Sequence, residues 1–129
     1  MSALLQLKIM GRPPNLHSTG THPSWQGQAR VRRERRAMVK VLAQGARHAA
    51  HMDVATGKRR LHVRLWWHGT RRDDPNLLQD LKADVDGLVD AGWLVNDNRE
   101  WLTIDYPPEV LLAVTKRDMA VEYTLYEGA

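Results

Sequence analysis

The carboxylates between Asp73 and Asp97 are the residues of this 129-residue chain whose types and spacing best suit chemistry. Residues 73–105 hold nine Asp and Glu against two Lys and Arg. Hard divalent cations such as Mg²⁺ and Mn²⁺ prefer oxygen ligands, and two or three carboxylates can hold such a metal for phosphodiester hydrolysis. Arg71 and Arg72, directly before Asp73, would offset the repulsion between the carboxylates and a phosphate backbone. The acidic segment therefore predicts metal-dependent chemistry on a phosphodiester.

Within this segment, helical spacing pairs Lys82 with Asp86 on the flank away from a leucine stripe. Such a pair can face one site together, and the plainer interpretation is a surface ion pair. Asp80 and Asp84 form a second pair with the same spacing. Asp74 is either a metal ligand or the N-cap of a helix that opens with the following proline. The sequence leaves both interpretations of Asp74 open.

Other familiar chemistry has little support in the sequence. The chain has no Cys, which excludes disulfides, cysteine-ligated zinc, iron–sulfur clusters and thiol nucleophiles. It also has no glycine-rich phosphate loop, no dinucleotide fingerprint and no serine in a nucleophile elbow. His48 and His51 are spaced to share a metal, but no third ligand is evident, and solvated histidines are the simpler interpretation.

Hydrophobic periodicity predicts the elements that position these residues. Alternating segments indicate strands, and a proline-free amphipathic stretch and a leucine-rich stretch ending at Gly92 indicate helices. The predicted order is strand 3–10, helix 25–46, strand 61–68, helix 75–91, and strands 99–106 and 119–126. Residues 109–115 have no assigned element. This order predicts a single α+β domain over residues 1–129, a small mixed sheet with helices mainly on one face.

Two of these elements are predicted to have contrasting faces. The apolar stripe of helix 25–46 is predicted to contain Val31, Met38, Leu42 and Ala46. Its basic outer face is predicted to contain Arg30, Arg33, Lys40 and Arg47. In strand 61–68, an apolar face of Leu61, Val63, Leu65 and Trp67 alternates with a basic and aromatic face of His62, Arg64, Trp66 and His68.

Charge is segregated along the chain. Net charge is +4, but residues 1–72 hold 15 Lys and Arg against two acids. A basic region joined to an acidic block suits a protein that grips a polyanion with one surface and divalent cations with another. The plainer interpretation is that the charges only solvate a small domain. The residues predicted to contact DNA phosphates are Arg30, Arg32, Arg33, Arg36 and Lys40 on the helix, with Arg71 and Arg72.

The acidic region also carries a resemblance. Residues 71–77 (RRDDPNL), 82–94 (KADVDGLVDAGWL) and 96–98 (NDN) together resemble the RusA family of Holliday junction resolvases. That family pairs an Arg-Asp-X-Asp-Asn segment with a helix ending in Asp-X-Leu-X-X-Ala-Gly and a later acidic pair. The opening strand followed by Pro-Pro-Asn is similar to the family's amino-terminal signature. The resemblance covers most of the chain, and its specificity is concentrated in residues 71–97.

The resemblance implies a dimeric endonuclease that uses Mg²⁺ or Mn²⁺ to cut branched DNA, in recombination or repair. It implies that Asp73 is the first metal carboxylate, Asp97 the distal one, and Lys82 the basic residue after the acidic motif. The family's second aspartate falls on a proline in this chain, which leaves Asp74 or Asp86 as its replacement. One carboxylate of the late acidic pair is an asparagine.

Helix geometry bears on how such a site would assemble. A straight helix over residues 75–91 separates its ends by about 25 Å, so one metal could not join Asp73 to Asp97 across it. Either Gly87 breaks the helix and the following loop folds back, or a two-fold dimer builds each site from two subunits. We expect the homodimer, because a symmetric junction needs two paired cuts.

Three functions follow as hypotheses. The first is a metal-dependent, structure-selective nuclease, and the second is a non-catalytic module that binds branched DNA with a degenerate acidic site. The third is a protein-interaction domain that docks a partner through exposed tryptophans. No segment approaches the roughly 18 uncharged residues that a membrane span needs. We therefore expect a soluble, unexported protein in the cytoplasm, the host's if the gene is carried by a phage.

Overall fold

The computed structural model describes residues 2–11, 25–69 and 81–128. The described elements are, in order, β1 (Leu5–Met10), α1 (Trp25–Ala49), β2 (Arg59–Trp67), α3 (Lys82–Asp90), β3 (Leu102–Ile104), β4 (Glu109–Leu112), the 3₁₀ turn η1 (Lys116–Asp118) and β5 (Ala120–Glu127). In these residues no helix combines the length and the apolar character needed to cross a bilayer.

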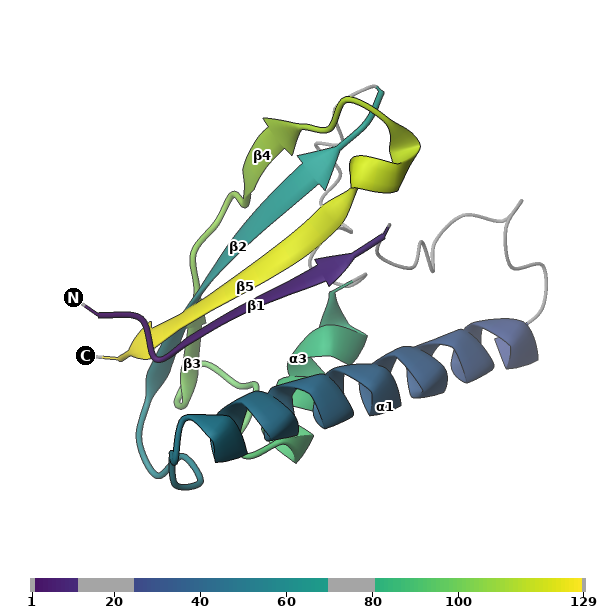
Figure 1. The fold of residues 1–129 in the computed structure, drawn as a ribbon. Helices are drawn as coiled ribbons and strands as arrows, with labels where there is room; N and C mark the ends of the chain where they lie inside the picture. Colours follow the sequence, from purple (N-terminus) through teal and green to yellow (C-terminus); the bar gives the residue numbers. More distant parts are fainter. Residues whose placement is uncertain (1, 12–24, 70–80, 129) are drawn as a thin grey trace.

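The strands form one mixed sheet of five strands in the order β1-β5-β2-β3, with β4 also paired to β2 (Figure 1). β5 is antiparallel to both β1 and β2. The short strands β3 and β4 both run parallel to β2, at its other edge. The predicted α+β class with a small mixed sheet is therefore confirmed.

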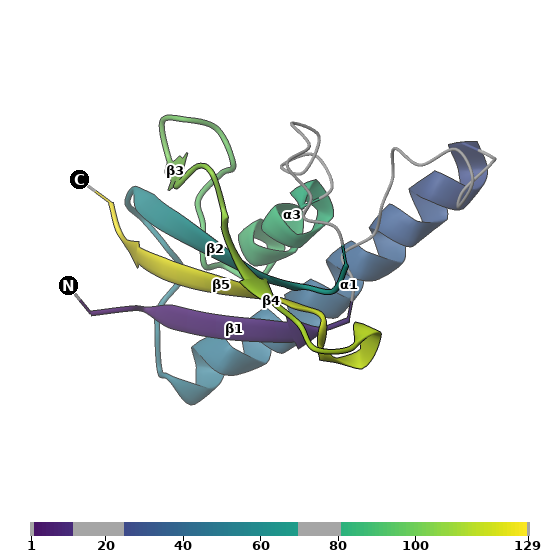
Figure 2. The ribbon, with the colours of Figure 1, turned by 90° about the horizontal axis from the view of Figure 1, so that it is seen from above.

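The sheet has one apolar and one polar face, as the alternation in β2 predicts. Leu61, Val63 and Leu65 are buried in a core that both helices also enter, whereas His62 and Arg64 are partly exposed on the opposite face. Both helices lie on the same side of the sheet (Figures 1 and 2). The helices thus cover one face and leave the other to polar and charged side chains.

The predicted apolar stripe of α1 is partly wrong. Met38 and Leu42 are 38% and 45% exposed, whereas Val39 and Ala43 are fully buried. The helix is turned so that these small side chains meet α3, where a Cβ on Gly87 would lie only 2.8 Å from Val39 Cβ. Close approach of two helices requires small residues at the contact, and this requirement outweighs the burial of larger side chains elsewhere on α1.

The prediction that Arg47 lies on the basic outer face of α1 is also wrong. Its Nε–H donates to the carbonyl of Ala91, and its Nη1 donates to the carbonyl of Met52. These carbonyls lie just beyond the last turns of α3 and α1, where backbone acceptors lack partners within the helix. The guanidinium thus ties the ends of the two helices together.

The end of α3 agrees with the prediction. Gly92 has a φ of +87°, its N–H donates to Val89 O, and the N–H of Trp93 donates to Leu88 O. These bonds form a Schellman motif, which requires a left-handed residue that glycine adopts without strain. The predicted start of this helix, with its N-cap at Asp74, lies outside the described residues.

The carboxy-terminal strands agree with the prediction only in part. β5 matches the predicted strand 119–126 closely, but the predicted strand 99–106 is reduced to β3. The N–H groups of Trp101 and Leu102 both donate to Asn98 O, so the residues before β3 form a turn. β4 lies in a segment to which periodicity assigned no element.

Candidate functional site

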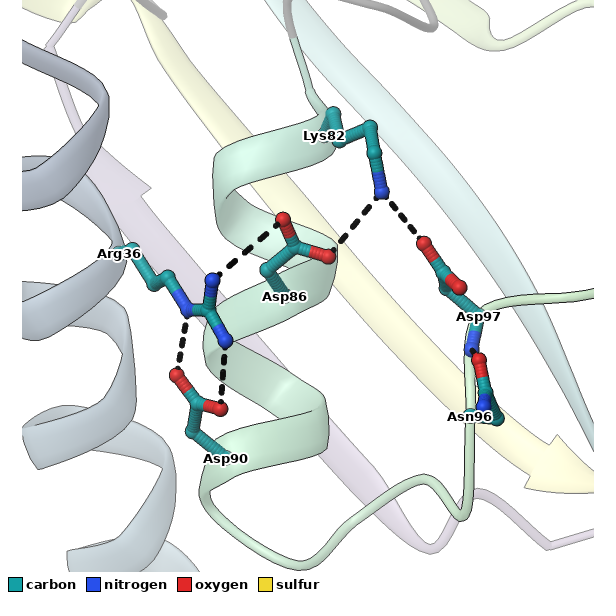
Figure 3. A network of polar contacts seen from close by, with 6 residues as sticks. All are labelled: Arg36, Lys82, Asp86, Asp90, Asn96 and Asp97. Carbon is teal, nitrogen blue, oxygen red and sulfur yellow. Dashed lines mark hydrogen bonds and ion pairs between the residues drawn. The ribbon is translucent and has the colours of Figure 1, made fainter. Parts of the chain in front are cut away.

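The ammonium group of Lys82 joins two carboxylates at the start of α3 (Figure 3). Lys82 Nζ lies 3.2 Å from Asp86 Oδ1 and 2.5 Å from Asp97 Oδ2. The Asp86 contact spans one helical turn, and Asp97 comes from the loop after the helix. Lys82 is 61% exposed, so this cluster opens to solvent.

The loop after α3 returns Asp97 to the beginning of the helix. Gly92 reverses the chain, and the next two residues, Trp93 and Leu94, are buried in the core. The indole Nε1–H of Trp93 donates to Ala43 O on α1, which anchors the returning chain. The side-chain oxygen of Asn96 then accepts the backbone N–H of Asp97 at 2.7 Å.

This return bears on the geometric expectation for Asp97, although its distance from Asp73 lies outside the described residues. Asp97 does not lie a helix length from the start of α3, because it contacts Lys82, the first residue of that helix. Gly87 does not break the helix, since it lies in its interior against α1. The separation that favoured a site built across two subunits is therefore absent between Asp97 and the start of α3. The dimer itself stays a prediction.

Ion pairing favours the charged forms of Lys82 and Asp97. A hydrogen bond from Lys82 is the main cause that lowers the pKa of Asp97, against the opposing effect of burial. The hydrogen bond to Asp97 is likewise the main cause that raises the pKa of Lys82, with Asp86 adding to it. Lys82 is therefore an ammonium and Asp97 a carboxylate at neutral pH.

Arg36 extends the cluster to α1 (Figure 3). Its Nε and Nη2 donate to the two carboxylate oxygens of Asp90 at 2.6 and 2.9 Å, and its Nη1 lies 4.0 Å from Asp86 Oδ2. Hydrogen bonding from Arg36 is the main cause that lowers the pKa of Asp90. Asp86 thus lies between two cations, Arg36 and Lys82. Arg36 was predicted to contact a DNA phosphate, and in the structure its guanidinium group binds acidic side chains of α3.

Asp84, a candidate in the sequence, is part of the core. Its side chain is fully buried and accepts a forked ion pair from Arg35, at 2.6 and 3.0 Å. Its second oxygen also accepts the hydroxyl of Tyr123. Burial, chiefly, raises the pKa of that hydroxyl well above its usual range. These partners make Asp84 a structural carboxylate that links α3 to α1 and β5.

Sequence reasoning missed the buried partners of Asp84. One signal was available for Arg35, because it falls four residues before Val39 and eight before Ala43 on the stripe of α1 that faces the core. Tyr123 lies within the predicted strand 119–126, but nothing in that pattern indicated a charged partner for its hydroxyl.

The other predicted DNA contacts on α1 are exposed. Arg32, Arg33 and Lys40 are exposed along the helix. Arg30 is exposed too, and its Nε donates to Glu34 at 2.9 Å. These side chains are accessible to a phosphate backbone, which is what the prediction requires of them.

The predicted metal site is only partly within the described residues. Asp73, Asp74, Arg71 and Arg72 lie outside them, so the structure describes Asp86 and Asp97 as the two carboxylates of the candidate set. Across residues 2–11, 25–69 and 81–128, no three His, Asp or Glu side chains are grouped so that they could hold a metal ion. The oxygen donors of Asp86 and Asp97 fit Mg²⁺ in kind. In the structure both bind the Lys82 ammonium.

The chain matches no protein-family model and no curated protein.

Proposed function

We propose that this protein is a metal-dependent, structure-selective endodeoxyribonuclease that cuts Holliday junctions or other branched DNA. The observation that supports this function is the meeting of Lys82, Asp86 and Asp97 at one solvent-accessible point. Two of these residues, Lys82 and Asp97, are the ones that the resemblance to resolvases identifies in the described part of the chain. They are separated by 15 residues, and the fold of the intervening loop brings them together.

In this proposal Lys82 acts as a fixed positive charge beside the reacting phosphate. The two carboxylates orient its ammonium, and a positioned cation stabilises charge that develops on phosphate oxygens. Asp73 and Asp97 would hold the metal, which supplies an activated water and charge stabilisation when bound. Asp74 would be either a third ligand or the N-cap of the helix. The exposed basic residues of α1 would position the duplex by contacting its backbone without reading sequence.

The proposal includes a homodimer. A four-way junction is symmetric, and two paired cuts require two sites related by a two-fold axis. Each chain would contribute one Lys82 cluster.

The second candidate function is a non-catalytic module that binds branched DNA. The pairing of both described carboxylates with cations favours it, since Lys82 neutralises Asp97 and shares Asp86 with Arg36. A cluster held by such ion pairs can persist as a structural feature without holding a metal.

A labelled four-way junction incubated with the protein in Mg²⁺, Mn²⁺ or EDTA tests the two candidates. The nuclease predicts symmetric nicks that appear only with metal, and the module predicts a gel shift without nicks under every condition. If the protein gives neither a shift nor nicks, both candidates are contradicted and a protein-interaction domain is favoured.

Substitutions test the site itself. Asp97→Asn and Asp73→Asn should abolish cleavage and keep or strengthen junction binding, because each removes a metal ligand and a repulsion toward phosphate. Asp74→Asn should have a smaller effect, since Asn caps a helix about as well as Asp. Asp53→Asn, at an exposed position outside the cluster, is the control for loss of one negative charge. Full cleavage by Asp97→Asn would refute the assigned site.

A further inference from the structure

The face of the sheet that the helices leave uncovered carries a depression of about 390 Å³. Its walls are the side chains of Arg60, His62 and Arg64 on β2, Asp105 after β3, and Tyr126 on β5. Arg60 and Tyr126 are register partners in the antiparallel β2–β5 pair. Directly paired residues project to the same face, so a guanidinium and a phenol ring stand side by side in this depression.

A chain of polar contacts fixes these walls. Arg60 Nε–H donates to Asp105 Oδ1 at 2.7 Å, and the other Asp105 oxygen lies 3.4 Å from His62 Nδ1. His62 Nε2 and Arg64 Nε both contact one oxygen of Glu109, at 3.3 and 3.2 Å. Because the side chains are already held in place, a ligand would bind with little loss of side-chain freedom.

The guanidinium group of Arg60 has unused hydrogen-bond donors. It is 53% exposed and binds Asp105 through Nε, and within the described part of the chain its two Nη groups have no hydrogen-bond partner. A hydrogen bond from Arg60 is the main cause that lowers the pKa of Asp105, so this carboxylate stays ionised and holds the guanidinium. Arg64 is more fully neutralised, since it also lies 3.6 Å from Glu122. The Nη pair of Arg60 is therefore the better binder of an anion, and its planar fork suits phosphate oxygens.

Tyr126 supplies a phenol ring to the wall of this depression. Trp66 lies on β2 and is already occupied by cations. The Lys8 ammonium is 4.0 Å from its ring centroid, and the Arg64 guanidinium is 5.9 Å from it. Unpaired bases bind proteins by stacking on aromatic rings while polar groups contact their edges. A ring, a phosphate-binding fork and a mixed set of donors and acceptors are the parts that a nucleotide needs, and the volume falls in the range of small-ligand sites.

We propose that this depression binds a nucleotide, with the Arg60 Nη donors on its phosphate and the Tyr126 ring stacked against its base. Lys82 and Asp86 belong to α3 on the other side of the sheet (Figure 1), so this site is separate from the Lys82 cluster. The nucleotide is either free or one unpaired residue of a single strand, because both present the same phosphate and base.

Calorimetric titration in EDTA tests this site without any cleavage. The probes are deoxyadenosine 5′-monophosphate, deoxyadenosine, inorganic phosphate and a short single-stranded oligodeoxyadenylate. We expect the monophosphate to bind more tightly than either of its two parts. An oligonucleotide that binds more tightly than the monophosphate identifies a strand as the source, and equal binding identifies the free nucleotide. Phosphate that binds as tightly as the monophosphate would overturn the proposal.

Paired variants locate the binding. Tyr126→Leu removes the ring and should weaken monophosphate binding by about 5- to 140-fold, whereas Tyr126→Phe keeps the ring and should bind as the parent does. Arg60→Gln should weaken binding of the monophosphate by about 10- to 140-fold and leave deoxyadenosine unaffected. Lys116→Gln on η1, outside the depression, controls for the loss of one positive charge.

Two results would refute the site. One is a monophosphate affinity that neither Tyr126→Leu nor Arg60→Gln changes, with both variants folded by circular dichroism. The other is no binding of monophosphate or oligonucleotide at millimolar concentration. Junction cleavage is measured in a separate assay. Failure of the nucleotide-binding proposal therefore does not contradict the proposed nuclease, and failure of the nuclease does not contradict nucleotide binding.

Discussion

Adding one methyl group at Gly87 should separate α1 from α3. A Cβ built there would lie 2.8 Å from Val39 Cβ and 2.9 Å from Arg36 O, whereas ordinary contacts of such an atom are 3.4–4 Å. The carbonyl of Arg36 is backbone, so no side-chain rotation can relieve the contact. Gly87→Ala therefore requires α1 to move, and α1 carries the arginine that holds the acids of α3.

The magnitude follows from a comparison with a second helical glycine. Overpacking of this kind costs about 1–3 kcal/mol. Alanine in place of glycine also stabilises a helix by about 1 kcal/mol, which offsets part of that cost. Gly45→Ala on α1 brings the same helical gain, and a Cβ at Gly45 meets nothing within 4 Å. The difference between the two variants therefore isolates the helix contact, and we expect Gly87→Ala to be less stable than Gly45→Ala by about 1–3 kcal/mol.

Urea unfolding followed by circular dichroism measures this difference, provided that the dependence of stability on urea is equal in the two variants. Gly45→Ala should be as stable as the parent protein or more stable. Equal stability of the two variants would refute the close approach of α1 and α3. The orientation of α1 would then be determined by something other than the small residues at that contact.

Other predictions concern the buried pair, the basic helix and acid stability. Arg35→Met leaves Asp84 buried without its cation and should lower the free energy of unfolding, measured in urea, by about 3–5 kcal/mol. A decrease no larger than that for a surface ion pair, about 0–1 kcal/mol, would contradict this. Arg33→Ala with Lys40→Ala should flatten the slope of log K against log salt for junction binding by roughly 0.9 per lost contact, and an unchanged slope and affinity would refute the phosphate contacts. The pKa of Asp90 is lowered in the fold, so its contribution to stability is present above its unfolded pKa of about 3.9 and is lost as pH falls through the lower folded value. Asp90→Asn should therefore destabilise the protein at pH 7 more than at pH 3, and an equal deficit at both would contradict the ion pair.

Local patterns in the sequence were enough to predict most of the secondary structure. Alternation assigned the buried and exposed faces of β2 because successive side chains of a strand point to opposite sides. Gly92 marked the end of α3 because a left-handed C′ position favours glycine. β4 was missed because Glu109–Leu112 is short and its side chains are exposed or only partly buried, so it has no clear alternation. Its pairing with β2 defines it as a strand.

Composition and spacing also singled out the residues of the candidate site, but they could not assign neighbouring acids to different environments. Asp84 and Asp86 are two residues apart on one helix, and only the packing of α3 against α1 and β5 decides that Asp84 is buried with Arg35 and Tyr123 while Asp86 joins Lys82. The rotation of α1 was likewise decided by the small residues at its contact with α3.

The sequence by itself determined the α+β order of elements, the two faces of the sheet and the residues worth testing, because these depend on periodicity and residue type within short segments. Only the tertiary structure decided that Asp97 meets Lys82. That contact depends on the path of a loop whose direction is set by burial of Trp93 and Leu94 and by a hydrogen bond to α1. These are long-range interactions, and no local pattern in the sequence records them.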